Sequence, residues 1–517
     1  MGNSNSEFAL RQGIVLPTLT VLQLPKFWIA ATILLICAIS ARLAYLAFFH
    51  PLSQYPGPRL WAISRLPWAW HVIRGDIWEP LDRFHDQYGP IVRIAPDELT
   101  YISPDAWKEI YATRPQLLKD PRSQTPPLNG ADSLFTAVGD DHRRIRGAFI
   151  NAFSDKALRD QSTLIENYSG QFIERLKAEL VDNPSHVVNI QRIIGYAAFD
   201  IISDLTWGES PKALRMSGDH NWIHRFFLHA QFSTVRNCLT RFSPLDKILS
   251  YFFLRITSKQ RIANAKLTSA RIDRRLAAGH TRSDFMTPII GKISEDGRKG
   301  ITKNEVLTNG LAAVIANSQL STIAMTTATY LLLQYPHHFQ HLAKEIRNAG
   351  FEHETDIKVS STQSLPYLDA VINEALRLHH PTPGSLPRIA PKDGLVIGGK
   401  YVPGGTVVGV NLHNVHNRSE NFYKPREFHP ERFLGKNDPR YSAVFEGDRK
   451  EAFQPFSMGP RNCIGAKVFL AEARVVLARL IWTFDMLLAE PEALTWLDQK
   501  AWLVFEPKPL RVKLYVR

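Results

Sequence analysis

A cysteine set between a tight turn and a long apolar helix constrains this chain more than any other feature. In the stretch FQPFSMGPRNCIGAKVFLAEARVVLARLIW, Gly459 and Pro460 make a turn, Cys463 ends it, and an apolar helix is expected to run as far as Trp482. A sulfur placed there lies near backbone amides at a helix N-terminus, which favours the thiolate and metal ligation. A lone cysteine is otherwise most often a buried free thiol, so the flanking residues have to decide.

Those flanking residues form a longer pattern, Phe456-x-x-Gly459-x-Arg461-x-Cys463-x-Gly465. Here the chain resembles the cytochrome P450 family of haem-thiolate enzymes. The resemblance implies that Cys463 is the axial ligand of the iron in haem b, that Phe456 packs near the sulfur, and that Arg461 contacts a haem propionate. A thiolate ligand pushes electron density onto iron and favours O–O cleavage, which is why this chemistry uses cysteine.

The resemblance extends from Tyr55 to the C-terminus and implies a cytochrome P450 fold, mainly α with small β-sheets. The residue pattern points the same way. Residues 89–94 and 98–102 alternate like strands, and residues 395–410 form a second β region with a hairpin turn at Gly398–Gly399. Helix-period segments dominate the middle of the chain.

An apolar run near the N-terminus predicts a single transmembrane helix before this fold. The run FWIAATILLICAISA, Arg42 and LAYLAFFH give about 23 residues, enough for a bilayer core of about 30 Å. No cleavage site is obvious, so we expect an uncleaved anchor; a buried soluble helix is the alternative, and MGNSNS also matches a myristoylation pattern at Gly2. The predicted order is an N-terminal tail (1–26), a transmembrane anchor (27–49), a proline-rich hinge (50–60) and a haem-thiolate catalytic domain (61–517).

A charged pair upstream of the cysteine predicts a buried ion network. Glu374 and Arg377 are three residues apart, so on a helix they share a face. Such a pair is most often a solvated bridge of little value, but apolar residues flank this one. In the family, the Glu-x-x-Arg pair joins an arginine from a later loop, which FHPERF supplies as Arg432. The resemblance therefore gives these three residues a structural role in supporting the haem pocket.

Three more basic residues are expected to contact haem. LPRIAP places Arg388 where the family uses a propionate-binding arginine, and DDHRRIRGAF places His142 and Arg146 four apart, like the family's Trp/His-x-x-x-Arg pair. Arginine suits carboxylates because its planar fork can bond two oxygens. The alternative for the DDHRRIR cluster is a solvated charged face.

Polar residues interrupt the apolar helix expected from about Val306 to Leu333, in VIANSQLSTIAM. The family helix here crosses the haem on its oxygen side and carries Ala/Gly-Gly-x-Asp/Glu-Thr-Thr/Ser. Aligned with that pattern, the glycine, acid, first threonine and last position are Asn317, Gln319, Leu320 and Ser321. These four are the candidate distal catalytic residues. Leucine cannot relay a proton and glutamine is not an acid, so proton delivery, where the reaction needs it, has to come from elsewhere. In a monooxygenase, Asn317, Gln319, Ser321, a bound water or a substrate hydroxyl would complete the proton path.

Three functions are compatible with this departure. The first is a monooxygenase that inserts one atom of O2, by hydroxylation or epoxidation, into a lipophilic intermediate of fungal secondary metabolism. Its electrons would come from NADPH through NADPH-cytochrome P450 reductase, with cytochrome b5 as a further partner. The second is a haem-thiolate isomerase or dehydratase that does not activate O2, because Gln319 and Leu320 replace the acid and threonine. The third is a non-catalytic haem protein that binds a ligand.

Partners and location follow from the resemblance, which is to filamentous-fungal microsomal members near the trichothecene and isotrichodermin oxygenases. It implies an endoplasmic reticulum membrane with the catalytic domain in the cytosol, and three scattered cysteines fit a reducing compartment. The excess of basic residues, 62 − 49 = 13, suits an acidic reductase, and no nucleic-acid module accompanies it. Substrate contacts are expected in Leu128 to Phe135, Leu214 to Thr240, near Leu320, in Thr382 to Leu386, and near Trp502.

Overall fold

The computed structural model describes most of the chain. Most of the predicted tail, with Gly2, lies outside the described residues, as does Leu128 at the start of one expected substrate loop. The described ranges are 25–127, 129–181, 183–216, 221–280, 282–295, 297, 300–490 and 495–517.

The fold is mainly α, as predicted. Long helices form where apolar residues recur at helical spacing. Several helices begin at proline, among them those that start at Pro104, Pro336 and Pro366, because the amide that proline lacks would have no partner in the first turn. The α-helices are α2 Pro25–Ala44, α3 Arg59–Ile63, α4 Leu66–Arg74, α5 Trp78–Tyr88, α6 Pro104–Trp107, α7 Gly139–Phe149, α8 Asp155–Leu180, α9 Ile190–Trp207, α10 Asn221–Leu239, α11 Asp246–Ala277, α12 Thr287–Ile290, α13 Lys303–Gln334, α14 Pro336–Arg347, α15 Pro366–Leu378, α16 Leu412–His416 and α17 Ala466–Thr483.

The strands form small sheets. The largest has the order β1-β2-β8-β5-β3, and the others are β4-β12-β9, β10-β11 and β6-β7. Gly398 and Gly399 connect β6 to β7 with positive φ angles, as the predicted hairpin requires. The strands are β1 Ile91–Ala95, β2 Glu98–Tyr101, β3 Leu118–Lys119, β4 Val187–Asn189, β5 Arg388–Ile389, β6 Leu395–Ile397, β7 Lys400–Val402, β8 Val407–Val410, β9 Phe484–Leu488, β10 Ala501–Trp502, β11 Val504–Phe505 and β12 Arg511–Val516.

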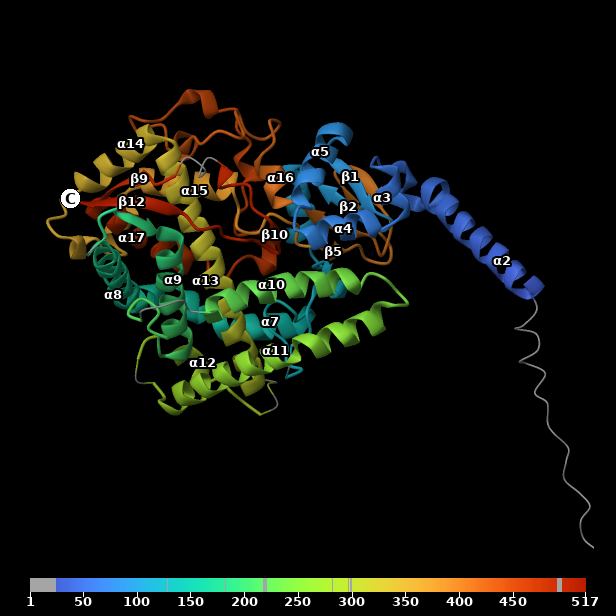
Figure 1. Cartoon of the computed structure of the whole chain (residues 1–517), viewed down its shortest axis with the longest axis horizontal. Coiled ribbons are helices and arrows are strands. Elements are labelled where there is room, and N and C mark those ends of the chain that lie inside the picture. The colour runs from blue at the N-terminus through green and yellow to red at the C-terminus, as the bar shows by residue number, and fades with distance from the viewer. Residues whose placement is uncertain are drawn as a thin grey trace, which may run out of the picture.

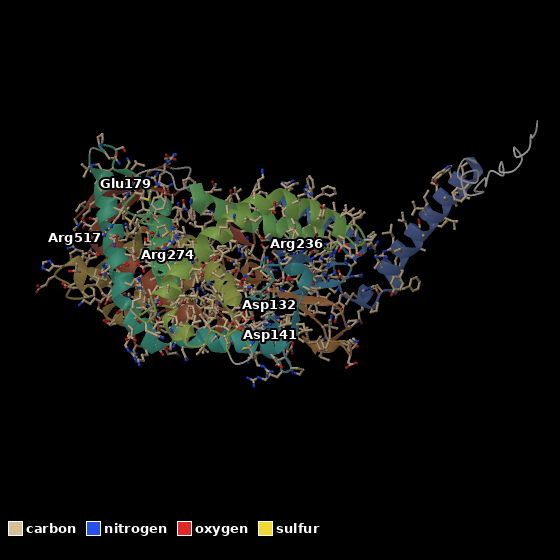
Figure 2. All side chains as sticks on the ribbon, turned by 90° about the horizontal axis from the view of Figure 1, so that it is seen from below. Asp132, Asp141, Glu179, Arg236, Arg274 and Arg517 are labelled. Carbon is tan, nitrogen blue, oxygen red and sulfur yellow. The ribbon has the colours of Figure 1, made fainter. Side chains whose placement is uncertain are left out.

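The N-terminal helix stands apart from the rest. The apolar stretch Phe27–Phe49 spans 23 residues, and no part of its most apolar section is buried. It is long and apolar enough to cross a membrane. Figure 1 shows α2 projecting from the globular part next to α3, and the blue helix projects in the same way in Figure 2. The buried Arg93 of β1 donates a hydrogen bond to the carbonyl of Leu46 (3.1 Å), so the end of this apolar stretch is tied to the small sheet.

Helix α13 occupies the centre of the globular part (Figure 1). It packs against α9, α15 and α17, and its C-terminal half joins the largest apolar core. Thr302 and Glu305 form a capping box that fixes its start. On its middle turns Ala313, Ala316 and Leu320, which share one face, are half-buried, whereas Val314 and Ser318 are buried. Helix α13 therefore presents small, partly accessible side chains on that face.

Candidate functional site

Cys463 lies between a short 3-10 turn, Gly459–Arg461, and the start of α17. Its amide donates to the carbonyl of Phe456 (2.8 Å), which closes the loop beneath the sulfur. Gly459 has a φ of 74°, and a Cβ at this position would come within 2.1 Å of the Tyr111 carbonyl oxygen, so only glycine fits. The local sequence thus positions Cys463 just before the N-terminus of α17.

The thiol of Cys463 does not ionise readily by itself. Burial raises its pKa, and this outweighs the backbone amides of Gly465 and Ala466 and the charge of Arg146, which all lower it. The backbone amides therefore act in the predicted direction, and burial opposes them. A bound metal ion would add the further stabilisation, because coordination deprotonates a thiol.

The predicted basic residues come together near the cysteine loop. His142 is buried on α7, and its pKa is lowered to about 4, first by burial and then by Arg461 and Arg146. Burial and neighbouring cations also lower the pKa of Arg461 to about 10, and burial lowers that of Arg388. Among the described residues, no carboxylate contributes to these shifts. The cluster needs anionic groups from elsewhere.

Buried nitrogens in this cluster lack partners. Arg461 donates from Nη2 to the carbonyl of Ala137 (2.5 Å), while its Nε and Nη1 have no hydrogen-bond partner among the described residues. Nε of Arg388 is likewise buried and unpartnered. Arg146 is directed instead to Asn462, beside Cys463, at 2.9 Å and 2.7 Å. Cationic forks with open donors beside a thiol fit a haem, which brings two propionates and an iron.

One member of the cluster was missed by the sequence reasoning. Lys119 of β3 pairs in register with Arg388 of β5. Its pKa is lowered to about 7, by burial first and then by Arg461 and Arg388. Its Nζ donates to the carbonyl of Phe135 (2.6 Å). The two-residue strand that carries Lys119 has no periodicity to detect, so only the sheet register reveals the lysine.

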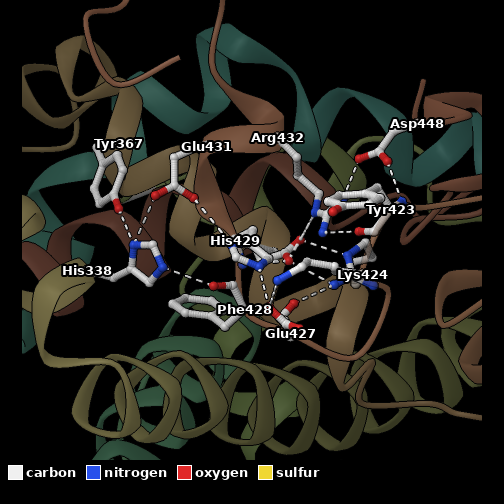
Figure 3. A network of polar contacts seen from close by, with 12 residues as sticks. His338, Tyr367, Tyr423, Lys424, Glu427, Phe428, His429, Glu431, Arg432 and Asp448 are labelled. Atoms are coloured by element: carbon white, nitrogen blue, oxygen red, sulfur yellow. Dashed lines mark hydrogen bonds and ion pairs between the residues drawn. The ribbon is translucent and has the colours of Figure 1, made fainter. Parts of the chain in front are cut away.

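The three residues of the predicted ion network meet in the core. Arg377 donates to both carboxylate oxygens of Glu374, at 2.7 Å and 2.8 Å, and all three side chains are at most 1% exposed. Arg432 reaches Glu374 at 3.1 Å, donates to the Tyr423 carbonyl and pairs with Asp448 (Figure 3). Every charge in this network has a partner, as a buried network requires.

A second cluster beside this network has metal-ligand composition. The ligand atoms of His338, His429 and Glu431 lie within 4.8 Å of one another. However, Nε2 of His338 donates to the Phe428 carbonyl (2.9 Å), and its Nδ1 accepts from the Tyr367 hydroxyl (2.6 Å), as Figure 3 shows. Burial lowers the pKa of His338 to about 3. A neutral ring with both nitrogens bonded serves here as a structural tie.

The polar residues of α13 separate into two groups. Ser318 and Thr322 bond back to carbonyls of their own helix, at 2.7 Å and 2.5 Å, which is ordinary for buried hydroxyls. Gln319 is buried, and its Nε2 has no partner among the described residues. The side chains of Asn317 and Ser321, which lie one turn apart, both make hydrogen bonds outside their own helix. They donate to the same oxygen of one carboxylate on α17.

That carboxylate is Glu472, which the sequence reasoning did not single out. Asn317 Nδ2 and Ser321 Oγ each lie 3.1 Å from its Oε2. Glu472 is fully buried, and burial raises its pKa to about 7 although both hydrogen bonds lower it. The sequence feature that could have indicated Glu472 is that it is the single acid in the apolar segment FLAEARVVL.

Leu320 does not share the polar surroundings of Asn317 and Ser321. It packs against an apolar cluster that contains Ala230 of α10 and Val504 and Phe505 of β11. The amide of Phe505 in turn donates to the carbonyl of Pro381, next to the expected substrate segment Thr382 to Leu386. Three of the expected substrate regions therefore meet at Leu320, and they make an apolar wall.

Comparisons with known proteins agree with this geometry. The sequence model of cytochrome P450 matches residues 55–514. Cytochrome P450 monooxygenase lcsI of Purpureocillium lilacinum is 37% identical over 480 residues, covering 92% of this chain and 91% of the relative. Averantin hydroxylase of Dothistroma septosporum is 37% identical over 476 residues (92% and 88%), and versicolorin B desaturase of the same fungus is 36% identical over 481 residues (92% and 91%). This chain is a member of the cytochrome P450 family and, like these fungal relatives, an oxidoreductase of the monooxygenase type.

Proposed function

We propose that this protein hydroxylates a lipophilic secondary metabolite, inserting one atom of O2 with electrons from NADPH delivered by a reductase. The observation that carries the proposal is the pairing of Cys463 with a cluster of cations that has open donors. Haem held there supplies a thiolate-ligated iron able to activate O2. Arg461, Arg388, Lys119 and His142 would hold its propionates, and Arg146 would brace Asn462 beside the thiolate.

The residues around the site have distinct tasks in this reaction. The half-buried face of α13 leaves room for a flat cofactor, because Ala313 and Ala316 are small. Leu320, Val504 and Phe505 exclude water and hold an apolar substrate. The Glu374 network keeps the segment before the cysteine loop rigid. Averantin is the first substrate to test, because a relative is named for its hydroxylation.

A second function is favoured by one observation, the replacement of the acid and threonine by Gln319 and Leu320. A haem-thiolate isomerase or dehydratase needs no proton delivery to O2, so it would tolerate this loss. A relative named as a desaturase shows that reaction type varies among proteins of this similarity. A ligand-binding protein without turnover is the third alternative, and the finer placement beside trichothecene oxygenases remains a prediction.

The setting is also part of the proposal. The apolar helix Phe27–Phe49 would hold the protein in the endoplasmic reticulum membrane with its catalytic domain in the cytosol. There it would meet NADPH-cytochrome P450 reductase and cytochrome b5, whose acidic surfaces suit a chain of net charge +13.

Labelled dioxygen tests the proposal directly. Membranes containing the full chain and reductase, supplied with NADPH and averantin, should yield a hydroxylated product that carries the label. A product that lacks the label and forms equally well without NADPH would establish the isomerase or dehydratase. Cys463→Ser is the control, because it should remove the thiolate-type spectrum of the reduced carbon monoxide complex together with product formation.

A further inference from the structure

Two histidines and a glutamate from separate parts of the chain meet beside the Glu374 network. His338 belongs to α14, whereas His429 and Glu431 lie at the start of the 3-10 turn Pro430–Phe433. One nitrogen of each histidine and one carboxylate oxygen all lie within 4.8 Å of one another. Tetrahedral coordination with bonds of about 2.0–2.1 Å would set two ligand atoms about 3.3 Å apart. The three side chains are therefore close to the spacing that a metal ion needs.

The ring of His338 directs a lone pair toward Glu431. Its Nε2 donates to the carbonyl of Phe428 (2.9 Å), which leaves Nδ1 without a proton. Oε1 of Glu431 lies 3.3 Å from this Nδ1, the separation that two ligands of one metal ion would have. Without an ion, Nδ1 accepts from the Tyr367 hydroxyl (2.6 Å) and the ring is a structural tie (Figure 3). A hydroxyl can rotate, so this bond does not bar a cation from Nδ1.

His429 is held in a similar way on the other side of the carboxylate. Its Nε2 lies 2.9 Å from Oε2 of Glu427, and its Nδ1 lies 4.0 Å from Oε2 of Glu431. A histidine that binds a metal ion through one nitrogen usually gives its other N–H to a carboxylate or a backbone carbonyl, which fixes the ring. His338 and His429 both have this arrangement, and both present Nδ1 to Glu431 (Figure 3).

Glu431 lacks a cation to balance it. Its Oε2 is buried and has no hydrogen-bond partner among the described residues, and its ion-pair contacts within the described ranges are to the two histidines. The neighbouring Glu427, in contrast, pairs with Lys424 at 3.0 Å. A buried carboxylate oxygen without a partner is costly. A cation between Glu431 and the two rings would satisfy this oxygen and both Nδ1 atoms together.

We propose that His338, His429 and Glu431 bind one divalent transition-metal ion, and that this ion fastens α14 to the turn that carries Arg432. Two imidazole nitrogens and one carboxylate suit Zn²⁺, whereas Mg²⁺ and Ca²⁺ prefer oxygen ligands. A water molecule fills the fourth position, and the Tyr367 hydroxyl turns from Nδ1 toward that water. The ion enters past His429 and Glu431, whose side chains are partly exposed.

The role of the ion is structural. Arg432 on the same turn donates to Glu374, and the amide of His429 donates to the same carboxylate (2.9 Å). Coordination at His429 and Glu431 would hold this turn against α14, so the ion should stabilise the folded state. None of the three ligands belongs to the cation cluster beside Cys463, so the inference is independent of the proposed reaction.

The ratio of zinc to haem iron tests the site directly. The full haem-loaded chain, made without a histidine tag and stripped of loose metal with a chelator, should bind about one zinc per iron on dialysis against Zn²⁺, and no Mg²⁺. His429→Gln removes a ligand but keeps the amide that bonds Glu374, and it should weaken zinc binding by about 100-fold or more. Glu427→Gln, which keeps all three ligands, should weaken it by about 10-fold. His280→Gln, at an exposed histidine outside the cluster, is the matched control and should bind as wild type.

Urea unfolding tests the structural role. Zinc at about ten times its dissociation constant should raise the midpoint of the wild type and of His280→Gln, and it should not change that of His429→Gln. An unaltered thiolate-type spectrum of the reduced carbon monoxide complex shows that each variant has folded. Zinc uptake that His429→Gln does not weaken, or that leaves the wild-type midpoint unchanged, would overturn the proposal. A wild type that takes up no zinc would overturn it too, because a proton would then bridge Glu431 and His338.

Discussion

Two fully buried glutamates, Glu374 and Glu472, lie in contrasting surroundings. Glu374 on α15 accepts hydrogen bonds at both oxygens, from Arg377, from Arg432 and from the amide of His429. Glu472 on α17 accepts two bonds from neutral groups at one oxygen and, within the described part of the chain, none at the other. Burial alone therefore does not define the role of an acid. The arginines paired with Glu374 keep it as a fixed structural charge. Glu472 is bonded to neutral groups, so it can hold a proton.

The same substitution at both glutamates should have opposite effects, with the larger one at Glu374. Glu374→Gln leaves Arg377 and Arg432 with a neutral partner in the core, which should lower the free energy of unfolding by about 3–5 kcal/mol. Urea unfolding of the haem-loaded protein measures it. Asp140→Asn, which breaks the exposed pair with Arg143, should cost less than about 1 kcal/mol. Equal small effects would mean that the Glu374 network is not needed for stability.

Glu472→Gln should instead stabilise the protein at high pH. The folded pKa of Glu472 is raised from 4.5 to about 7, so its stabilising contribution is complete below pH 4.5 and is lost as pH rises through 7. The difference in unfolding free energy between variant and wild type should shift by about 3 kcal/mol in favour of the variant from about pH 5 to about pH 8. Glu427→Gln, at an exposed acid whose pKa is lowered, should not show this shift. If the difference in unfolding free energy did not change with pH, Glu472 would have to be ionised beside a cation. It would then resemble Glu374, and the two glutamates would no longer differ in their surroundings.

Lys119→Met tests whether the cations beside Cys463 bind the haem propionates, in the way that Arg377 and Arg432 bind the carboxylate of Glu374. Loss of one charge-assisted bond should speed the transfer of haem to apomyoglobin about tenfold. Lys467→Met is the control, because Lys467 is exposed and pairs with Asp155. Unchanged haem retention would exclude Lys119 from the propionate site.

Leu320→Thr should have the smallest effect. Threonine removes apolar packing against the cluster that contains Val504 and Phe505, which should cost about 1 kcal/mol of stability. In the proposed monooxygenase the reaction proceeds with leucine at this position, so the new hydroxyl should add little, and the ratio of product formed to NADPH consumed should stay within about twofold of wild type. A large gain in that ratio would show that the wild-type α13 lacks a functional proton path.

The sequence predicted those parts of the structure that depend on short segments. The cysteine loop, the hairpin at Gly398–Gly399 and the Glu374–Arg377 pair each follow from residues close in the chain. Lys119 and Glu472 could not be predicted, because their partners lie far away in sequence and meet them through sheet register or helix packing. The amides of Gly465 and Ala466 lower the pKa of Cys463 as the sequence predicted, whereas the opposing effect of burial depends on the whole fold and could not be predicted from the loop.

The cation cluster beside Cys463 also bears on how much of this protein a cell can keep. Without haem, Lys119, Arg388 and Arg461 repel one another in a poorly solvated place, as their lowered pKa values show. A ligand that binds only the folded state stabilises it in proportion to its free concentration and affinity. We therefore expect newly made chains to survive quality control according to haem supply, so that a shortage of haem lowers the amount of protein before it lowers the activity of each molecule.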